Sequence, residues 1–183
     1  AKLRASFSTG STLTGIVNAL EQPDTQDPLG LRRAQMKDDP RQVDPVAITF
    51  DTRKSIEHRQ GGLVYEHPLG GGDVLRLSAY GGARKVVQYL AIPLAAQMAP
   101  TSGGGVVDLD RTFGGAGLRY TATRATGSGP LRLTAGIEHD RMDERRKGFV
   151  NEFGVKGALK RNQDDRVSST DFFAIGEWAF APR

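Results

Sequence analysis

The residues that most often carry catalysis or bind metals are few and scattered in this sequence. The three histidines, His58, His67 and His139, lie far apart, and none belongs to the His-Glu-x-x-His spacing of zinc hydrolases. Cysteine is absent, which excludes thiolate metal sites, Cys nucleophiles and disulfides. We therefore expect no metal site, and we expect each histidine at a strand end or on a surface.

Glycine-rich and acidic stretches are the remaining candidates for a chemical site. Residues 70–72 and 103–105 are Gly-Gly-Gly, but neither run is followed by the Lys-Ser or Lys-Thr of a P-loop, which favours a turn and a flexible loop. Ser128 lies in Gly-Ser-Gly, a turn sequence without the spacing of a nucleophile elbow. The acidic stretches lack calcium-loop spacing, and interspersed arginines favour solvated, self-neutralised loop charge at residues 38–39, 108–110, 140–144 and 164–165. We expect no catalytic residues and no enzyme activity.

Composition restricts the class of protein. The chain has 183 residues, of which only 38% are hydrophobic, a low fraction for a packed soluble globule. No apolar run approaches the ~18 residues of a transmembrane helix, so a membrane role would belong to strands. The net charge of +4 is spread along the chain rather than gathered in one stripe, so nucleic acid is not an expected partner.

Alternation of apolar and polar residues with a period of two dominates the chain and predicts strands with two different faces. In the clearest case Leu131, Leu133 and Ile137 share one face, and Arg132 and Glu138 share the other. The pattern predicts about seven strands, at residues 2–8, 12–20, 58–67, 73–84, 118–123, 131–138 and 170–181. The expected fold is all-β, an antiparallel up-and-down meander.

The connections between these strands are expected to alternate between short and long. Residues 9–11, 68–72 and 126–129 carry glycine and predict tight hairpin turns. Residues 21–57, 85–111 and 145–169 are predicted to be long loops, and all three would emerge from the same end of the sheet. Connections of that length are usually functional or disordered.

Short turns at one end and long loops at the other are typical of bacterial outer-membrane barrels. A strand-built membrane span must be part of a closed cylinder, and seven strands do not make one, so neighbouring strands are expected outside this chain. The absence of an export signal in residues 1–6 and the end of the chain directly after a strand-like run also favour an internal fragment. A soluble β-barrel or sandwich, acting as a binding or adhesin-like module, has the same periodicity and remains the alternative.

Several loop sequences resemble those of a known family. Residues 22–31 (QPDTQDPLGL), 39–45 (DPRQVDP), 50–55 (FDTRKS), 88–94 (QYLAIPL), 106–111 (VVDLDR) and 153–159 (FGVKGAL) are similar to TonB-dependent receptors of the ferric-citrate or siderophore type. The resemblance implies a bacterial outer-membrane location and a 22-stranded barrel filled by a plug domain. Residues 1–183 would be part of that barrel, without the plug and without the TonB box.

The resemblance also implies a transported ligand and a binding site. The ligand would be a ferric chelate, no resident cofactor is implied, and the partners would be the plug, the other barrel strands, TonB and outer-membrane lipid. An anionic chelate needs a rim of guanidinium, ammonium, amide and phenol groups. The candidates, at the ends of the second long loop, are Arg84, Lys85, Gln88, Tyr89 and Arg111; ordinary loop-base packing is the competing interpretation for all five.

Overall fold

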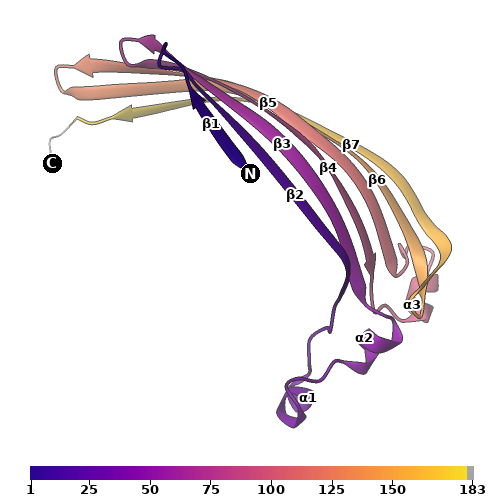
Figure 1. Ribbon diagram of the computed structural model, residues 1–183. Coiled ribbons are helices and arrows are strands. Elements are labelled where there is room, and N and C mark those ends of the chain that lie inside the picture. The colour runs from indigo at the N-terminus through magenta and orange to yellow at the C-terminus, as the bar shows by residue number, and fades with distance from the viewer. Residues whose placement is uncertain (181–183) are drawn as a thin grey trace.

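The computed structural model describes residues 1–180 and contains a single antiparallel sheet of seven strands in the order β1-β2-β3-β4-β5-β6-β7 (Figure 1). The prediction of an all-β meander is confirmed. The strands are β1 (Lys2–Ser6), β2 (Thr12–Gln26), β3 (Arg53–Gly70), β4 (Asp73–Tyr89), β5 (Val106–Thr126), β6 (Gly129–Glu152) and β7 (Val155–Trp178). Residue 181, the predicted end of the last strand, lies outside the described residues.

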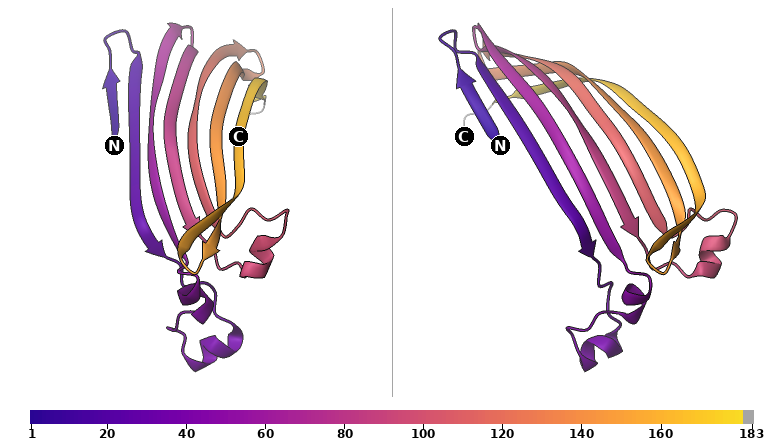
Figure 2. Two further views of the ribbon diagram at one scale, coloured as in Figure 1. Left: turned by 90° about the vertical axis from the view of Figure 1, so that its right-hand side faces the viewer. Right: turned by 45° about the vertical axis from the view of Figure 1, so that its right-hand side comes forward.

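The sheet is curved and does not close. Within residues 1–180, β1 pairs with β2 and β7 pairs with β6, so each keeps one edge without a partner (Figure 2). Unpaired backbone N–H and C=O groups along a sheet edge readily pair with another strand. The architecture is therefore an open, curved sheet with two edges available for pairing.

Two connections contain short helices and project from one end of the sheet, which we call the loop end (Figure 2). The first holds α1 (Arg33–Asp38) and α2 (Pro45–Thr49), and the second holds α3 (Leu94–Met98). The opposite end, which we call the turn end, carries the tight turns after β1, β3 and β5, as predicted. No helix among residues 1–180 has the length and apolar character needed to cross a membrane.

The prediction of a third long loop at residues 145–169 is wrong. Strand β6 continues to Glu152, and β7 begins at Val155, so only Phe153 and Gly154 connect them. Both have positive φ, 53° and 92°, as a type I′ hairpin turn requires. The first two loops are also shorter than predicted, because β2, β3, β4 and β5 continue into them.

The extensions of β2, β3, β6 and β7 are largely polar on both faces, and those of β4 and β5 carry valine on both faces, which is why they lack the period-two signal. Opposite charges face each other across the strands instead, as in Asp110 with Arg145 at 4.0 Å and Asp143 with Arg166 at 2.7 Å. Cross-strand pairs of opposite charge stabilise a sheet modestly. The acidic residues 108–110, 140–144 and 164–165 thus lie on strands, not in loops, although their neutralisation by arginine is as expected.

The two faces of the sheet differ along its turn-end half. On the apolar face, one cross-strand row contains six large side chains: Leu13, Tyr65, Leu77, Leu118, Ile137 and Phe172. Leu77, Leu118 and Phe172 are exposed, with Phe172 at 79%, and the other three are half-buried. Nearer the loop end, a row on the same face is entirely charged: Glu21, Glu57, Lys85, Asp110, Arg145 and Asp164. The opposite face, the polar face, carries most of the arginines and hydroxyl groups discussed below.

The small apolar core lies at the loop end, not within the sheet. The buried apolar side chains of the described residues are those of Ala47, Phe50, Val106 and Val150. They come from α2, its C-terminal boundary, and the ends of β5 and β6. Burial of apolar surface therefore stabilises the packing of the loops, whereas the sheet itself depends on backbone pairing and cross-strand contacts.

Candidate anion-binding face

Strand alternation divides the five predicted binding residues between the two faces of the sheet. Arg84, Gln88 and Arg111 lie on the polar face of β4 and β5, and Arg84 is directly opposite Arg111. Lys85 and Tyr89 lie on the other face. All five are on strands rather than in a loop. The structure therefore brings three of the five predicted residues to one surface.

The cross-strand pair Arg84 and Arg111, which we call the loop-end rung, is held asymmetrically. Arg111 donates through Nε to Glu144 Oε2 at 2.7 Å, and the Glu144 side chain is only 7% exposed. Within residues 1–180, Arg84 makes no hydrogen bond or ion pair with another side chain, and it is exposed. One guanidinium group of the rung is thus anchored by a buried carboxylate, and the other remains available to a ligand.

His58 extends this row by one strand, since it lies opposite Arg84 on β3. Its ring stacks on Phe113 with centroids 5.9 Å apart, and Nε2 lies 3.1 Å from Gln60 Oε1. Its Nδ1 atom is buried without a hydrogen-bond partner in the described structure. From the sequence, His58 is expected only at a strand end or on a surface, because a linear sequence does not show which residue lies beside it on another strand.

Lys85 and Tyr89 have other partners on the opposite face. Lys85 lies between Glu57 and Asp110 in the charged row. The guanidinium carbon of Arg53 lies 3.7 Å from the centroid of the Tyr89 ring, a cation–π contact. Both residues therefore have a local structural explanation, and their side chains are separated from Arg84 by the sheet.

A buried polar cluster joins the two long connections to the β6–β7 turn. Asn151 is 0% exposed; its Nδ2 donates to the carbonyls of Phe50 at 2.9 Å and Leu90 at 3.0 Å. Its Oδ1 accepts from the amide of Gly154 at 2.7 Å. Buried Gln97 of α3 accepts from the Asn151 amide at 2.7 Å through Oε1. One side chain thereby satisfies backbone groups from three separate connections.

Arg53 makes a second link at the same end. Its guanidinium group pairs with Asp51 and donates to the Gly154 carbonyl at 3.2 Å. Next to it, the rings of Phe50 and Phe153 stack with centroids 5.6 Å apart. These contacts and those of Asn151 hold the base of the first connection against the β6–β7 turn.

The remainder of the first connection is organised around Asp44, the N-cap of α2. Its Oδ1 accepts from the amide of Val46 at 2.9 Å, and its Oδ2 accepts from Gln35 Nε2 at 3.2 Å. These two hydrogen bonds, led by that from Val46, lower the pKa of the Asp44 carboxyl below its usual value because they favour the ionised form. Asp44 also places α2 next to the segment that holds α1.

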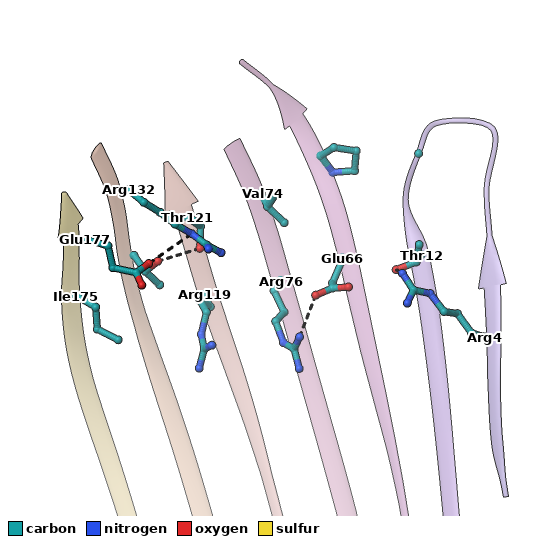
Figure 3. A pocket seen from close by; sticks show the side chains of 13 residues that line it. Arg4, Thr12, Glu66, Val74, Arg76, Arg119, Thr121, Arg132, Ile175 and Glu177 are labelled. Carbon is teal, nitrogen blue, oxygen red and sulfur yellow. Dashed lines mark hydrogen bonds and ion pairs between the residues drawn. The ribbon is translucent and has the colours of Figure 1, made fainter. Parts of the chain in front are cut away.

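At the turn end, the polar face forms a hollow of about 550 Å³ across the whole sheet (Figure 3). Its charged lining consists of Arg4, Arg76, Arg119, Arg132, Glu66 and Glu177. Arg76 pairs with Glu66 at 2.9 Å, and Arg132 lies 3.8 Å from Glu177. Arg76 and Arg119 are directly opposite each other, and we call this pair the turn-end rung.

The groups gathered on the polar face are mainly hydrogen-bond donors with permanent positive charge. Guanidinium groups bind carboxylates and phosphates through two parallel hydrogen bonds, which makes this face chemically suited to anions. The sequence pattern identified the polar face, but it did not identify the cross-strand neighbours, and it missed the Asn151 cluster altogether. A search of protein-family models finds none that matches the chain.

Proposed function

We propose that this chain is wall and loop structure of a TonB-dependent outer-membrane receptor that imports a ferric chelate. In this proposal the apolar face contacts outer-membrane lipid, and the polar face lines the interior of a 22-stranded barrel completed by other strands of the parent protein. The plug domain and the segment that binds TonB belong to the parent. The observation that carries the proposal is the exposed apolar face of an unclosed sheet with a polar face behind it.

The extent of the apolar face supports the proposal. On β5 it comprises Gly114, Ala116, Leu118, Tyr120 and Ala122. Residues 114–122 span about 27 Å along the strand at ~3.4 Å per residue. Transmembrane strands need about 9–11 residues and an apolar band of about 25 Å. The charged row, which crosses β5 at Asp110, would then lie beyond the hydrocarbon region.

The open edges and the small core favour a barrel wall over a self-contained β-module. A soluble barrel or sandwich buries its apolar face against a second layer. In residues 1–180 the row from Leu13 to Phe172 has no covering layer, and the few buried apolar side chains lie at the loop end. A larger closed barrel in a bilayer would both pair the edges and cover the apolar face.

The transport proposal is tested with the full-length protein that contains this segment. It is expressed in iron-starved bacteria that lack their own ferric-citrate uptake, and binding and import of radiolabelled ferric citrate and of several ferric siderophores are measured. We expect saturable binding and import of at least one chelate, with import abolished by dissipation of the inner-membrane proton gradient. If the cells neither bind nor import any of these chelates, the proposal is wrong.

The membrane proposal is tested separately. Residues 1–183 are expressed alone and purified without detergent. We expect them to aggregate or to require detergent, because both sheet edges and the apolar face are uncovered. Recovery of a monodisperse, β-rich monomer would instead support the self-contained binding or adhesin-like module.

A further inference from the structure

Two arginine rungs lie on the same pair of strands and on the same face. Arg84 and Arg111 form the loop-end rung, and Arg76 and Arg119 form the turn-end rung. The two rungs are eight residues apart along β4, which corresponds to about 27 Å. Like charges directly opposite each other on neighbouring strands are destabilising, so each rung needs compensation.

The surrounding carboxylates compensate the turn-end rung only in part. A guanidinium group has five N–H donors. Arg76 gives one of them to Glu66 at 2.9 Å. Arg119 has an ion pair with Glu138 at 3.6 Å, and its guanidinium carbon lies 5.2 Å from the centroid of the Phe173 ring. The two side chains are 43% and 46% exposed. Most of the donors in the rung therefore face the hollow or solvent without a protein acceptor.

The hollow also has the charge and size for a small polyanion. Four arginines and two glutamates are among the residues that line its volume of about 550 Å³. Arg4, on the far side of the hollow, has no carboxylate partner in residues 1–180 and contacts Thr12 at 3.5 Å. Figure 3 shows Arg76 and Arg119 side by side on β4 and β5, with Arg132 of β6 nearer the turns.

Two aromatic rings and two carboxylates lie on the polar face between the rungs. Tyr80 is opposite Gly115, and Gly82 is opposite Phe113. A Cβ at Gly115 would lie 2.7 Å from the Tyr80 ring, and one at Gly82 would lie 2.7 Å from the Phe113 ring, so both rings lie close against the glycine backbone of the neighbouring strand. On β6, Glu138 is opposite Gly117, and Asp140 accepts a hydrogen bond from the Tyr80 hydroxyl.

We propose that the turn-end rung is a second anion-binding site, which takes a carboxylate-bearing ferric chelate after it leaves the loop-end rung. This inference rests on the proposed transport function. Arg76 and Arg119 would each present free N–H donors to carboxylate oxygens of the chelate.

The test uses the full-length protein and the double variant R76Q/R119Q, with R145Q as the control. Arg145 lies in the charged row on the opposite face of the sheet, where it pairs with Asp110 at 4.0 Å, and it does not line the hollow. We measure ferric-citrate binding to de-energised cells and the import rate in energised cells. For R76Q/R119Q we expect binding within about twofold of the unmodified protein and import lowered about tenfold, the effect of losing one or two charge-assisted hydrogen bonds. R145Q should import within about twofold of the unmodified protein.

A second measurement separates the chelate from acidic side chains of the polypeptide inside the barrel. Hydrogen exchange of residues 74–80 and 117–123 is followed in detergent with and without excess ferric citrate. Protection by ferric citrate in the unmodified protein, lost in R76Q/R119Q and partly kept in R76K/R119K, would support the proposal. If ferric citrate gives no protection, and R76Q/R119Q instead exposes the barrel's contents to protease, the rung binds protein carboxylates and the proposal fails.

The outcomes also separate this inference from the proposed function. If the unmodified protein imports ferric citrate and R76Q/R119Q imports it equally fast, the second site is refuted while the transport proposal stands. If R145Q reduces import as much as the double variant, the effect comes from loss of positive charge anywhere on the sheet, and the rung is refuted. If the unmodified protein binds and imports no chelate, the transport proposal itself is refuted.

Discussion

Replacement of Asn151 by alanine should release both long connections from the sheet. The side chain is 0% exposed and satisfies three backbone groups, the carbonyls of Phe50 and Leu90 and the amide of Gly154. A buried polar group left without a partner costs about 1–3 kcal/mol. Because water can reach part of the opened cluster, we expect N151A to lower the free energy of opening of the loop end by about 3–5 kcal/mol, rather than the full sum for three groups.

Hydrogen exchange with peptide resolution is the appropriate assay, since the loss should be regional. A loss of 3–5 kcal/mol corresponds to a decrease of roughly 100- to 4000-fold in amide protection. The decrease should appear together in residues 46–52, 90–105 and 149–154, while the turn-end halves of β4 and β5 keep their protection. N162A is the control, because Asn162 is exposed on β7 and makes no side-chain hydrogen bond in residues 1–180.

The reasoning would be refuted by a purely local effect. If N151A reduced protection only in residues 149–154, Asn151 would not be joining the connections. N151D provides a further check, because it replaces the two N–H donors by a carboxylate oxygen that faces the carbonyls of Phe50 and Leu90. Its effect should be at least as large as that of N151A.

Three further predictions concern the sheet and the first connection. G136A should destabilise the protein by about 1–3 kcal/mol by overpacking, because the new Cβ would lie 2.7 Å from the Leu118 carbonyl oxygen. Chemical unfolding checks this against the control G176A, where the atom nearest to the new Cβ is 3.6 Å away. L118K should weaken insertion of the full-length protein into lipid vesicles by about 2–4 kcal/mol, while S78K on the polar face should leave it nearly unchanged; equal losses would contradict the assignment of the lipid face. The pKa of Asp44 is lowered in the folded state, so the stabilisation of α2 by the Asp44 carboxylate should be complete above the ordinary Asp range near pH 4 and lost as the pH falls below that range. Amide exchange of residues 45–49 should show this loss in the unmodified protein. D44N, which keeps a side-chain acceptor without the titrating group, should not show it.

The strand pattern could be predicted where the two faces differ chemically. Along residues 131–138, apolar and polar side chains alternate, and the structure has β6 there. The pattern stopped at Glu138 because the continuation of β6 to Glu152 is polar on both faces. The β6–β7 turn did have a local signal in the sequence, because two-residue hairpin turns often have glycine at their second position, as Phe153-Gly154 does.

The binding candidates show the limit of reasoning from a resemblance. Arg84, Lys85, Gln88 and Tyr89 are predicted to share a rim because they lie at the mouth of the second predicted long loop, but neighbouring residues of a strand point to opposite faces. If residues 85–111 had been one long loop, no such division would have applied. The continuation of β4 to Tyr89 separated Lys85 and Tyr89 from Arg84.

The sequence by itself determined the class of the fold, the two faces of its sheet and the three tight turns at one end. These features are local, because alternation and glycine-bearing turns act over a few residues. The tertiary structure alone decided which side chains meet: Arg84 with Arg111, Arg76 with Arg119, and Asn151 with backbone groups from three connections. Arg84 and Arg111 are 27 positions apart in the sequence, and Asn151 and Phe50 are 101 positions apart. A linear pattern contains no information about which of many distant residues lies opposite another.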